Sequence, residues 1–212
     1  MSSSAAMVTM IDRQVGEVLA LLKELGIDDN TLVVFASDNG PQGETSREMG
    51  NQGTPDMGNS GPFRGELGEA TEGSIRTFCL VRWPGKVKPG TSSYAMFSIM
   101  DFFPTFADLS GVSVNSIPRL KINGVSISGR IQDLPVEMPV RTLYWEFGKQ
   151  AGDPNSGIVG EVFQAARRGP WKAVRYGIQS PVELYNLNSD PGESTELSEI
   201  NPEIHEEFVR LF

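Results

Sequence analysis

The stretch that decides the fold is Thr31-Leu32-Val33-Val34-Phe35-Ala36, which runs directly into Ser37-Asp38-Asn39-Gly40. The first run lacks the alternation of a strand with one face in water, and turn residues bound it on both sides. Such a run is typical of a strand that is buried on both faces, as in a parallel sheet. We therefore expect residues 31–36 to form a strand inside an α/β domain.

A helix is predicted immediately upstream of this strand, over residues 7–25. Charged side chains fill one face, and the other face carries apolar residues at steps of three and four: Val8, Ile11, Val15, Val18, Leu19, Leu22 and Leu25. Gly26 stands where a glycine in the left-handed conformation ends a helix. A helix that leads into a buried strand is the order of an α/β unit.

The middle of the chain alternates between irregular and regular patterns. Residues 39–75 are rich in glycine and hold no sustained period, which is typical of a functional or disordered segment. Residues 77–83 predict a second buried strand, ended by Pro84-Gly85. Residues 97–110 predict a helix that is closed by Gly111.

From about residue 120 the pattern changes to short strands separated by turns. Strands are predicted at 142–147, 171–176 and 183–187, and together they indicate a small antiparallel sheet. A last helix is predicted to begin at Asn201-Pro202, with Ile204, Phe208 and Leu211 on one face.

Composition excludes several classes of protein. The chain has 212 residues, of which 39% are apolar, so it can bury a core and wholesale disorder is excluded. A net charge of −9 argues against a nucleic-acid partner, because phosphate contacts need clustered Lys and Arg. No stretch reaches 18 consecutive apolar residues, and the first six residues lack the pattern of a signal peptide. We therefore expect no membrane span, and the sequence assigns no compartment.

The chain contains a single cysteine and a single histidine. One cysteine excludes an internal disulfide framework and a cysteine zinc site. Cys79 lies in an apolar run and is expected to pack as a small hydrophobic side chain. His205 lies among Glu203, Glu206 and Glu207, so we expect a solvated surface histidine rather than a catalytic one.

The first candidate site is the pair Asp38 and Asn39. Ligands of open α/β sheets bind outside the carboxyl ends of the strands, where this pair is expected to lie. A carboxylate beside a carboxamide offers the hard oxygen ligands that suit Ca²⁺ or Mg²⁺. The alternative is that Asp, Asn and Gly are ordinary turn residues. Two oxygens do not complete a shell of six to eight ligands, so spacing alone leaves both alternatives open.

The second candidate is a pair of arginines, in Ser60-Gly61-Pro62-Phe63-Arg64-Gly65 and in Glu72-Gly73-Ser74-Ile75-Arg76. Arginines at loop ends can clamp an oxyanion through bidentate hydrogen bonds. They can equally form ion pairs that fix the loop, and we favour this alternative; the candidate partners are Glu44, Glu66, Glu69 and Glu72.

Several phrases, taken together and in order, resemble the C-terminal half of a sulfatase of the arylsulfatase family. They span nearly the whole chain, and no single phrase is decisive. The phrases are Ile11-Asp12-Arg13-Gln14-Val15-Gly16, residues 30–41, Gly61-Pro62-Phe63-Arg64-Gly65, Glu72-Gly73-Ser74-Ile75-Arg76, Arg82-Trp83-Pro84-Gly85-Lys86, Met100-Asp101-Phe102-Phe103-Pro104-Thr105, Asn123-Gly124-Val125-Ser126 and residues 184–193.

The resemblance implies a fold and a chemistry. The fold is α/β: part of an alkaline-phosphatase-like sheet with helices over residues 1–118, then a small antiparallel sheet and helix over residues 119–212. The chemistry is hydrolysis of sulfate esters by a formylglycine hydrate, while Ca²⁺ and basic side chains hold the sulfate oxygens. Asp38 and Asn39 match the second pair of Ca²⁺ ligands of that family.

The departures from the family pattern are equally informative. The Asp-Asp metal pair and the Cys-x-Pro-x-Arg motif, from which formylglycine forms, are absent from the printed sequence, so the Ca²⁺ site is incomplete and no catalytic residue is assigned. Ser60 opens a Ser-x-Pro-x-Arg pattern, but we reject it as the nucleophile because it aligns with a later loop of the family. Leu67 stands where the family usually places a sulfate-contacting lysine, and Gln42 where many relatives have histidine.

Three hypotheses follow for the function. The leading one is a Ca²⁺-dependent sulfuric ester hydrolase whose chain, as printed, does not turn over sulfate esters. The alternative is a non-catalytic, degenerate sulfatase homologue that binds a sulfated ligand or a protein partner. The third is a fragment of a longer gene. Relatives are often exported or lysosomal, and the specific sulfate ester stays open.

A physical expectation concerns the strand at residues 32–35. In the family, some of the neighbours that bury this strand lie in the half that the printed sequence lacks. Exposed apolar strand edges invite pairing with other chains. We therefore expect self-association or poor solubility.

Overall fold

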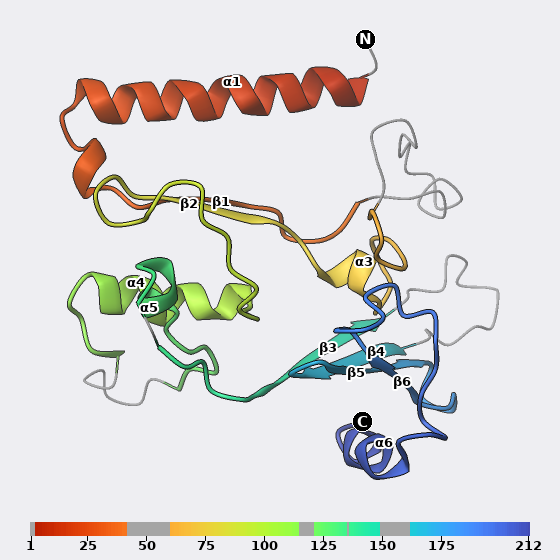
Figure 1. The fold of residues 1–212 in the computed structure, drawn as a ribbon. Coiled ribbons are helices and arrows are strands. Elements are labelled where there is room, and N and C mark those ends of the chain that lie inside the picture. The colour runs from red at the N-terminus through yellow and green to blue at the C-terminus, as the bar shows by residue number, and fades with distance from the viewer. Residues whose placement is uncertain (1–2, 42–59, 115–120, 135, 149–161) are drawn as a thin grey trace. The chain divides into compact units, whose positions relative to one another are not determined.

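The structure is a computed structural model, and it describes residues 3–41, 60–114, 121–134, 136–148 and 162–212 (Figure 1). The chain divides into two compact units. Unit 1 comprises residues 1–36 and 79–139, and unit 2 comprises residues 37–78 and 140–212. The mixed α/β composition with a small antiparallel sheet is confirmed. The division at residue 118, inferred from the resemblance, stays a prediction.

Unit 1 begins with helix α1 (Ser3–Glu24), which starts earlier than predicted. Its end is confirmed: Gly26 has a φ of +67°, where glycine meets no steric penalty. The Gly26 N–H donates to the Lys23 carbonyl at 3.1 Å, and the Ile27 N–H donates to the Leu22 carbonyl at 3.1 Å. These two bonds are the Schellman pattern, which satisfies carbonyls that the helix leaves unpaired.

The predicted first strand exists, but its surroundings differ from the expectation. β1 (Val33–Ala36) pairs antiparallel with β2 (Cys79–Arg82), and within the described residues their sheet has only these two strands. Val33 and Val34 are half-buried, whereas Phe35 and Ala36 are exposed. The prediction of a strand buried on both faces of a parallel sheet is therefore wrong for the described chain, because no further described strand pairs with β1.

The end of β2 is tied to the short helix η1 (Asp28–Asn30). The Arg82 guanidinium donates to both carboxylate oxygens of Asp28, at 2.7 and 2.8 Å. This bidentate bond holds the pKa of Asp28 below its ordinary value. The Trp83 Nε1 donates to the Asp29 carbonyl at 3.1 Å, so the last residue of β2 and the residue that follows it both bind the same turn.

The helix predicted near the middle of the chain consists of a 3₁₀ turn, η3 (Ile99–Asp101), and α4 (Phe102–Leu109). Asp101 is fully buried, and a buried carboxylate is tolerated only where donors reach it. The Ser98 N–H donates to its Oδ2 at 2.7 Å, and the Val125 N–H donates to its Oδ1 at 2.9 Å. Asp101 thereby joins α4 to the segment that leads into α5 (Ser128–Ile131).

Unit 2 holds a four-stranded antiparallel sheet in the order β3-β4-β5-β6 (Figure 1). The predicted small antiparallel sheet is confirmed, and three of its strands were anticipated. The strand missed from the sequence is β4. The bounds are β3 (Thr142–Gly148), β4 (Val162–Arg168), β5 (Trp171–Tyr176) and β6 (Glu183–Asn186).

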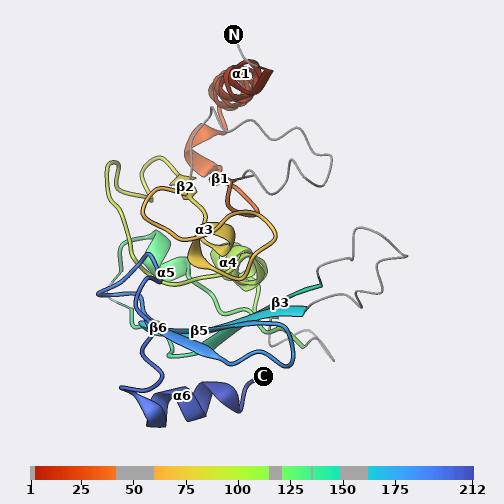
Figure 2. The same cartoon turned by 90° about the vertical axis from the view of Figure 1, so that its right-hand side faces the viewer.

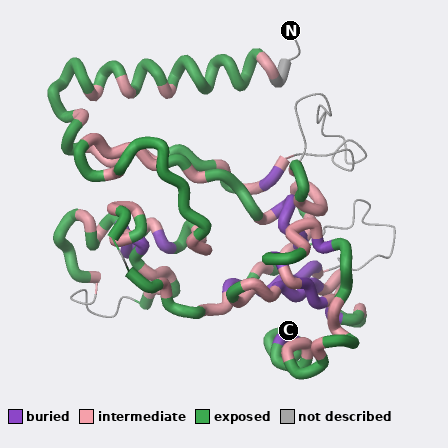
Figure 3. Tube along the Cα trace, viewed as in Figure 1, coloured by how far each residue is buried: buried purple, intermediate pink, exposed green. Residues whose placement is uncertain are grey.

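Each face of this sheet packs against a helix, α3 (Glu72–Ile75) on one side and α6 (Pro202–Val209) on the other (Figure 2). Side chains alternate between the faces along each strand, as the two-residue period requires. The α3 side gathers Ala70, Phe163, Ala165, Val174 and Tyr185, and the α6 side gathers Ala166, Ala173, Val182, Leu184 and Phe208. Figure 3 shows that buried residues concentrate in this unit; in unit 1 the buried apolar residues described are Ile127 and Pro104.

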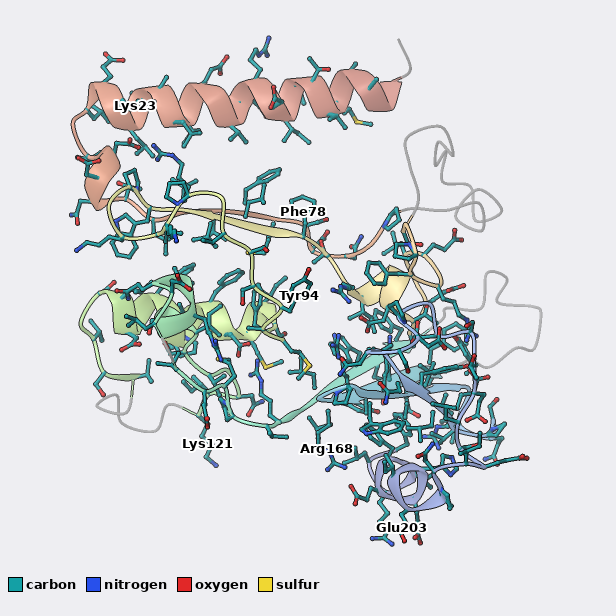
Figure 4. All side chains as sticks on the ribbon, viewed as in Figure 1. Lys23, Phe78, Tyr94, Lys121, Arg168 and Glu203 are labelled. Atoms are coloured by element: carbon teal, nitrogen blue, oxygen red, sulfur yellow. The ribbon has the colours of Figure 1, made fainter. Side chains whose placement is uncertain are left out.

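Helix α6 begins at Asn201-Pro202 as predicted, and its Phe208 is fully buried. Leu211 lies beyond the end of the helix and is exposed, so it does not pack with the other two apolar residues. The Arg168 guanidinium lies over the Phe208 ring and pairs with Glu207 on this side of the sheet, and Glu203 projects away from the sheet (Figure 4).

His205 and Cys79, the single histidine and the single cysteine of the chain, are both half-buried. The Nε2–H of His205 donates to the Val182 carbonyl at 2.9 Å, so the prediction of a solvated surface histidine is wrong. This hydrogen bond fastens α6 to the residue that directly precedes β6. Cys79 is half-buried in β2, and this burial raises the pKa of its thiol.

Among the described residues, every helix is either too short or too polar to cross a membrane. α1 has the length, at 22 residues, but charged side chains interrupt it.

The exposed apolar side chains of unit 1 lead to a first prediction. Val18 is 53% exposed on α1 and Leu80 is 62% exposed on β2. Covering one such side chain is worth about 1.5–3 kcal/mol, so we expect copies of the chain to associate. Sedimentation velocity should show a weight-average coefficient that rises with concentration. The double variant Val18→Lys/Leu80→Lys should weaken this association about tenfold or more.

The matched control is Thr9→Lys/Thr91→Lys, which adds the same charge at exposed polar positions of the same unit. It should associate as the unchanged chain does. A monomer at all concentrations, with a sharp and reversible thermal transition, would contradict the prediction.

Candidate metal centre

The Asp38-Asn39 pair forms a bend directly after β1, and its backbone is fixed on its C-terminal side. The Gly40 N–H donates to the Ser74 carbonyl at 2.7 Å, and the Leu67 N–H donates to the Pro41 carbonyl at 2.9 Å. A Cβ atom on the buried Gly40 would lie 1.8 Å from the carbonyl oxygen of Gly73. Only glycine therefore permits this close approach of two backbone segments.

The side chains of the pair leave their oxygens available. The Asn39 Nδ2 donates to the Gly40 carbonyl at 2.9 Å, and the Ser37 hydroxyl donates to the Asn39 carbonyl at 3.0 Å. Within the described residues, nothing donates to the Asn39 Oδ1, and the exposed Asp38 carboxylate makes no hydrogen bond or ion pair. The pair therefore presents a carboxylate and an amide oxygen, which is the donor chemistry that Ca²⁺ prefers.

These two residues provide only part of a coordination shell. Ca²⁺ takes six to eight oxygen ligands. Across the described ranges, no three His, Cys, Asp or Glu side chains gather closely enough to hold a metal ion. Gln42 and Glu44, which the sequence raised as site or loop residues, lie outside the described residues. The role of Asp38 and Asn39 as metal ligands stays a prediction that their donor chemistry supports.

The loop that begins at Ser60 is closed by its own hydrogen bonds. The Ser60 hydroxyl donates to the Phe63 carbonyl at 2.7 Å, and the Phe63 N–H donates back to the Ser60 carbonyl at 3.2 Å. This pattern is a turn with a side-chain bond, which serine commonly forms. It agrees with the interpretation of Ser60 as a turn residue rather than a nucleophile.

Arg64 is held by the C-terminal sheet. Its Nη1 donates to the Tyr185 hydroxyl at 2.9 Å and to the Glu193 carbonyl at 3.1 Å, and its Nη2 donates to the Tyr176 hydroxyl at 3.3 Å. The Glu183 carboxylate lies 3.7 Å from the same guanidinium. The interpretation of this arginine as a loop anchor is confirmed, although its acidic partner is Glu183 rather than one of the anticipated glutamates.

The two tyrosines that contact Arg64 stay protonated at neutral pH. Burial, together with the Glu183 carboxylate, raises the pKa of Tyr185 to about 12, although Arg64 opposes the shift. Burial also raises the pKa of Tyr176 well above its ordinary value. A protonated hydroxyl can donate and accept at once, and Tyr185 does both: it accepts from Arg64 and donates to Glu183 at 2.6 Å.

Arg76 packs over the Phe63 ring, with its guanidinium carbon 4.4 Å from the ring centroid. It also lies 3.8 Å from Glu72, one of the four partners that the sequence suggested. Both arginines therefore hold the loop to its surroundings, and the contacts described for them are internal to the protein.

A feature that the sequence analysis missed is a cluster of buried charges next to this loop. We call Glu72, Arg167, Lys172 and Glu193 the buried ion cluster. The Lys172 Nζ donates to Glu72 Oε1 at 3.1 Å, and the Arg167 Nη1 donates to Glu72 Oε2 at 3.1 Å. The Glu72 N–H donates to Glu193 Oε2 at 2.7 Å. One signal pointed to it: Lys172 interrupts an otherwise favourable strand sequence, at a position that shares a face with Val174.

Comparison with known proteins supports the resemblance read from the sequence. A family model described as Sulfatase matches residues 1–112, and a model described as N-sulphoglucosamine sulphohydrolase, C-terminal, matches residues 70–210. The chain belongs to the sulfatase family. The loop, the bend at Asp38-Asn39 and the C-terminal sheet all lie within the matched residues.

Individual sulfatases show how much of the family domain this chain covers. An uncharacterized sulfatase of Schizosaccharomyces pombe is 29% identical over 98% of this chain and 42% of its own length. The steryl-sulfatase of Mus musculus is 45% identical over 107 residues, which are 50% of this chain and 17% of that protein. The crystal structure of Ps i-CgsB with k-i-k-neocarrahexaose matches with a TM-score of 0.75 and 29% identity, over 97% of this chain and 41% of that one.

These likenesses confirm the predicted alkaline-phosphatase-like α/β class. The chain spans less than half the length of each of these relatives. The half-buried Leu67 is tied through its backbone to Pro41, which is two residues after Asn39. A leucine side chain cannot donate to an anionic oxygen.

The contacts of Arg64 lead to a second prediction. The substitution Arg64→Met removes three hydrogen bonds, each from a charged donor. Since the Arg64 side chain is 38% exposed, solvent screening reduces the effect, and we expect a loss of about 1–2 kcal/mol in the free energy of unfolding. Chemical denaturation measures this loss.

Arg210→Met is the matched control, because Arg210 pairs with Glu206 where both side chains are mostly exposed. It should change stability by less than about 0.5 kcal/mol. Equal losses for the two variants would show that Arg64 does not anchor the loop.

Proposed function

We propose that this chain is the C-terminal part of a Ca²⁺-dependent sulfuric ester hydrolase of the arylsulfatase type. The observation that carries the proposal is the pair Asp38 and Asn39. Their side-chain oxygens are without partners in the described chain, on a backbone that Gly40 fixes to Ser74. Membership of the sulfatase family provides the class of reaction.

The chain's own residues have definable roles in that reaction. The Asp38 carboxylate and the Asn39 amide oxygen hold the cation, and Gly40 keeps the bend at a fixed distance from α3. When bound, Ca²⁺ supplies positive charge beside the sulfate oxygens, where negative charge develops as the nucleophile attacks sulfur. The 212 residues include no Cys-x-Pro-x-Arg motif, so the formylglycine nucleophile of the family has no source among them.

A third prediction tests the metal role. Titration with Ca²⁺, followed by the amide resonances of Asp38, Asn39 and Gly40, should give saturable shifts with a Kd of roughly 1 mM or weaker, because two side-chain oxygens form only part of a shell. Asp38→Ala should abolish these shifts. Asp12→Ala, at an exposed position on α1, should leave them unchanged.

The same samples test the inactivity of the chain by itself. With an aryl sulfate and Ca²⁺, we expect no turnover above a blank. Turnover that Asp38→Ala abolishes would show that the 212 residues suffice for catalysis and would overturn this expectation. Absence of any Ca²⁺-dependent shift would overturn the metal role.

A second candidate function is binding of a sulfated ligand without hydrolysis. Leu67 favours it, since an apolar side chain, on a backbone bonded to Pro41, stands where the family is expected to have a lysine. Removing one such donor lowers catalysis on the order of 10²–10³-fold.

A fourth prediction separates the two functions. Calorimetry with a sulfated glycan should give saturable heat without hydrolysis if the chain is a binding protein. Leu67→Lys should then tighten binding about tenfold or more, because a charge-assisted hydrogen bond is worth roughly 1.5–3 kcal/mol. Leu67→Met is the control and should not change the affinity. No heat at millimolar glycan for any variant counts against the binding function.

A further inference from the structure

The buried ion cluster lies between the loop that begins at Ser60 and the four-stranded sheet β3-β4-β5-β6. The side chains of Lys172 and Glu193 are 0% exposed and that of Glu72 is 2% exposed. Charges this far from water are tolerated only when opposite charges and donors surround them. The cluster therefore requires all its members in place at once.

The contacts of the cluster join four separate stretches of chain. Lys172 comes from β5 and Arg167 from β4, and both donate to the Glu72 carboxylate at the start of α3. Glu193, which follows β6, accepts the Glu72 N–H and lies 3.0 Å from the Lys172 Nζ. That last contact is electrostatic, because within the described chain Glu193 Oε1 has no hydrogen-bond donor.

Glu193 is held in place by its own turn. Its φ is +51°, a left-handed conformation that non-glycine residues rarely adopt. The preceding Asp190 stabilises the turn by accepting the N–H groups of Ser194 and Thr195, both at 2.8 Å. The Glu193 carbonyl also accepts from Arg64 at 3.1 Å, so the residue contacts the loop through both backbone and side chain.

From the cluster, a short path of backbone contacts leads to the candidate ligands. The Gly73 N–H donates to the Arg64 carbonyl at 2.6 Å, and the Ser74 carbonyl accepts the Gly40 N–H. A Cβ on Gly73 would lie 2.3 Å from the Gly65 carbonyl oxygen, and one on Gly40 would lie 1.8 Å from that of Gly73. Backbones packed this closely move together, so the place of Glu72 determines the place of Gly40.

We infer that the buried ion cluster is a positioning device: Lys172, through Glu72, holds α3 on the C-terminal sheet and thereby sets the position of the Asp38-Asn39 bend. This inference rests on the proposed function for the significance of the bend, although the mechanical link stands on the contacts alone. Lys172, Glu72 and Glu193 are positioning residues, because none of them is placed at the sulfate ester or the cation.

The fifth prediction measures this link by amide hydrogen exchange in the full chain without Ca²⁺. Lys172→Met removes the charge and retains an unbranched side chain. We expect exchange at the Gly40 and Gly73 amides to accelerate at least tenfold, since their hydrogen bonds join the bend, the loop and α3. Amides in the β4–β5 ladder, such as those of Ala166 and Ala173, should change less than threefold.

Two further variants make the result decisive. Lys172→Met/Glu193→Gln removes one charge of each sign and retains an acceptor for the Glu72 N–H, so it should restore most of the protection at Gly40. If Lys172→Met alone does not fold, the exchange rates of this double variant are measured in its place. Arg210→Met removes a charge from an exposed pair and should change none of these rates.

If hydrogen exchange accelerates equally at Gly40 and in the β4–β5 ladder, the cluster only stabilises unit 2 as a whole, and this result would overturn the inference. Unchanged exchange at Gly40 would do the same. Repeating the Ca²⁺ titration on Lys172→Met should weaken the response at least fivefold. If the unchanged chain shows no response to Ca²⁺, the proposed function fails, and the exchange rates still decide the inference.

Discussion

The contact between the Lys172 ammonium and the Glu72 carboxylate is the constraint on which unit 2 of the chain depends. A lysine without solvent exposure must have its charge neutralised, and Glu72 and Glu193 provide the only opposite charges that reach it in the described chain. Satisfying that charge brings α3 onto the sheet, and α3 brings the bend at Asp38-Asn39 with it. The need to neutralise the buried charge of Lys172 thus sets the position of the candidate metal centre.

The two compact units differ in how completely they cover their apolar surfaces. The sheet of unit 2 carries a core on both faces, with Val174 on the α3 side and Leu184 on the α6 side. In unit 1, side chains such as Val18 and Leu80 remain exposed. Apolar burial is the main source of stability in folded proteins. The packed core of unit 2 can therefore hold the candidate metal centre in a fixed position.

Local signals predicted most of the elements and failed where tertiary pairing overrides propensity. Gly26 predicted the end of α1 because a positive φ is a local property of glycine. The strand β4 was missed because its centre, Gln164-Ala165-Ala166, has little intrinsic preference for a strand. It forms because β3 and β5 pair with it on either side, and alanine fits where α3 and α6 approach the sheet closely.

The sequence by itself determined the family, the order of most of the elements and the candidate ligands Asp38 and Asn39, because each depends on residues that are neighbours along the chain. Only the tertiary structure decided that β1 pairs antiparallel with β2 and that Glu72 is buried between two strands. The residues of the ion cluster are separated by 100 positions between Glu72 and Lys172, and by 121 between Glu72 and Glu193. A hydrogen bond acts over about 3 Å of space whatever the distance along the chain, so no local pattern could have revealed these partners.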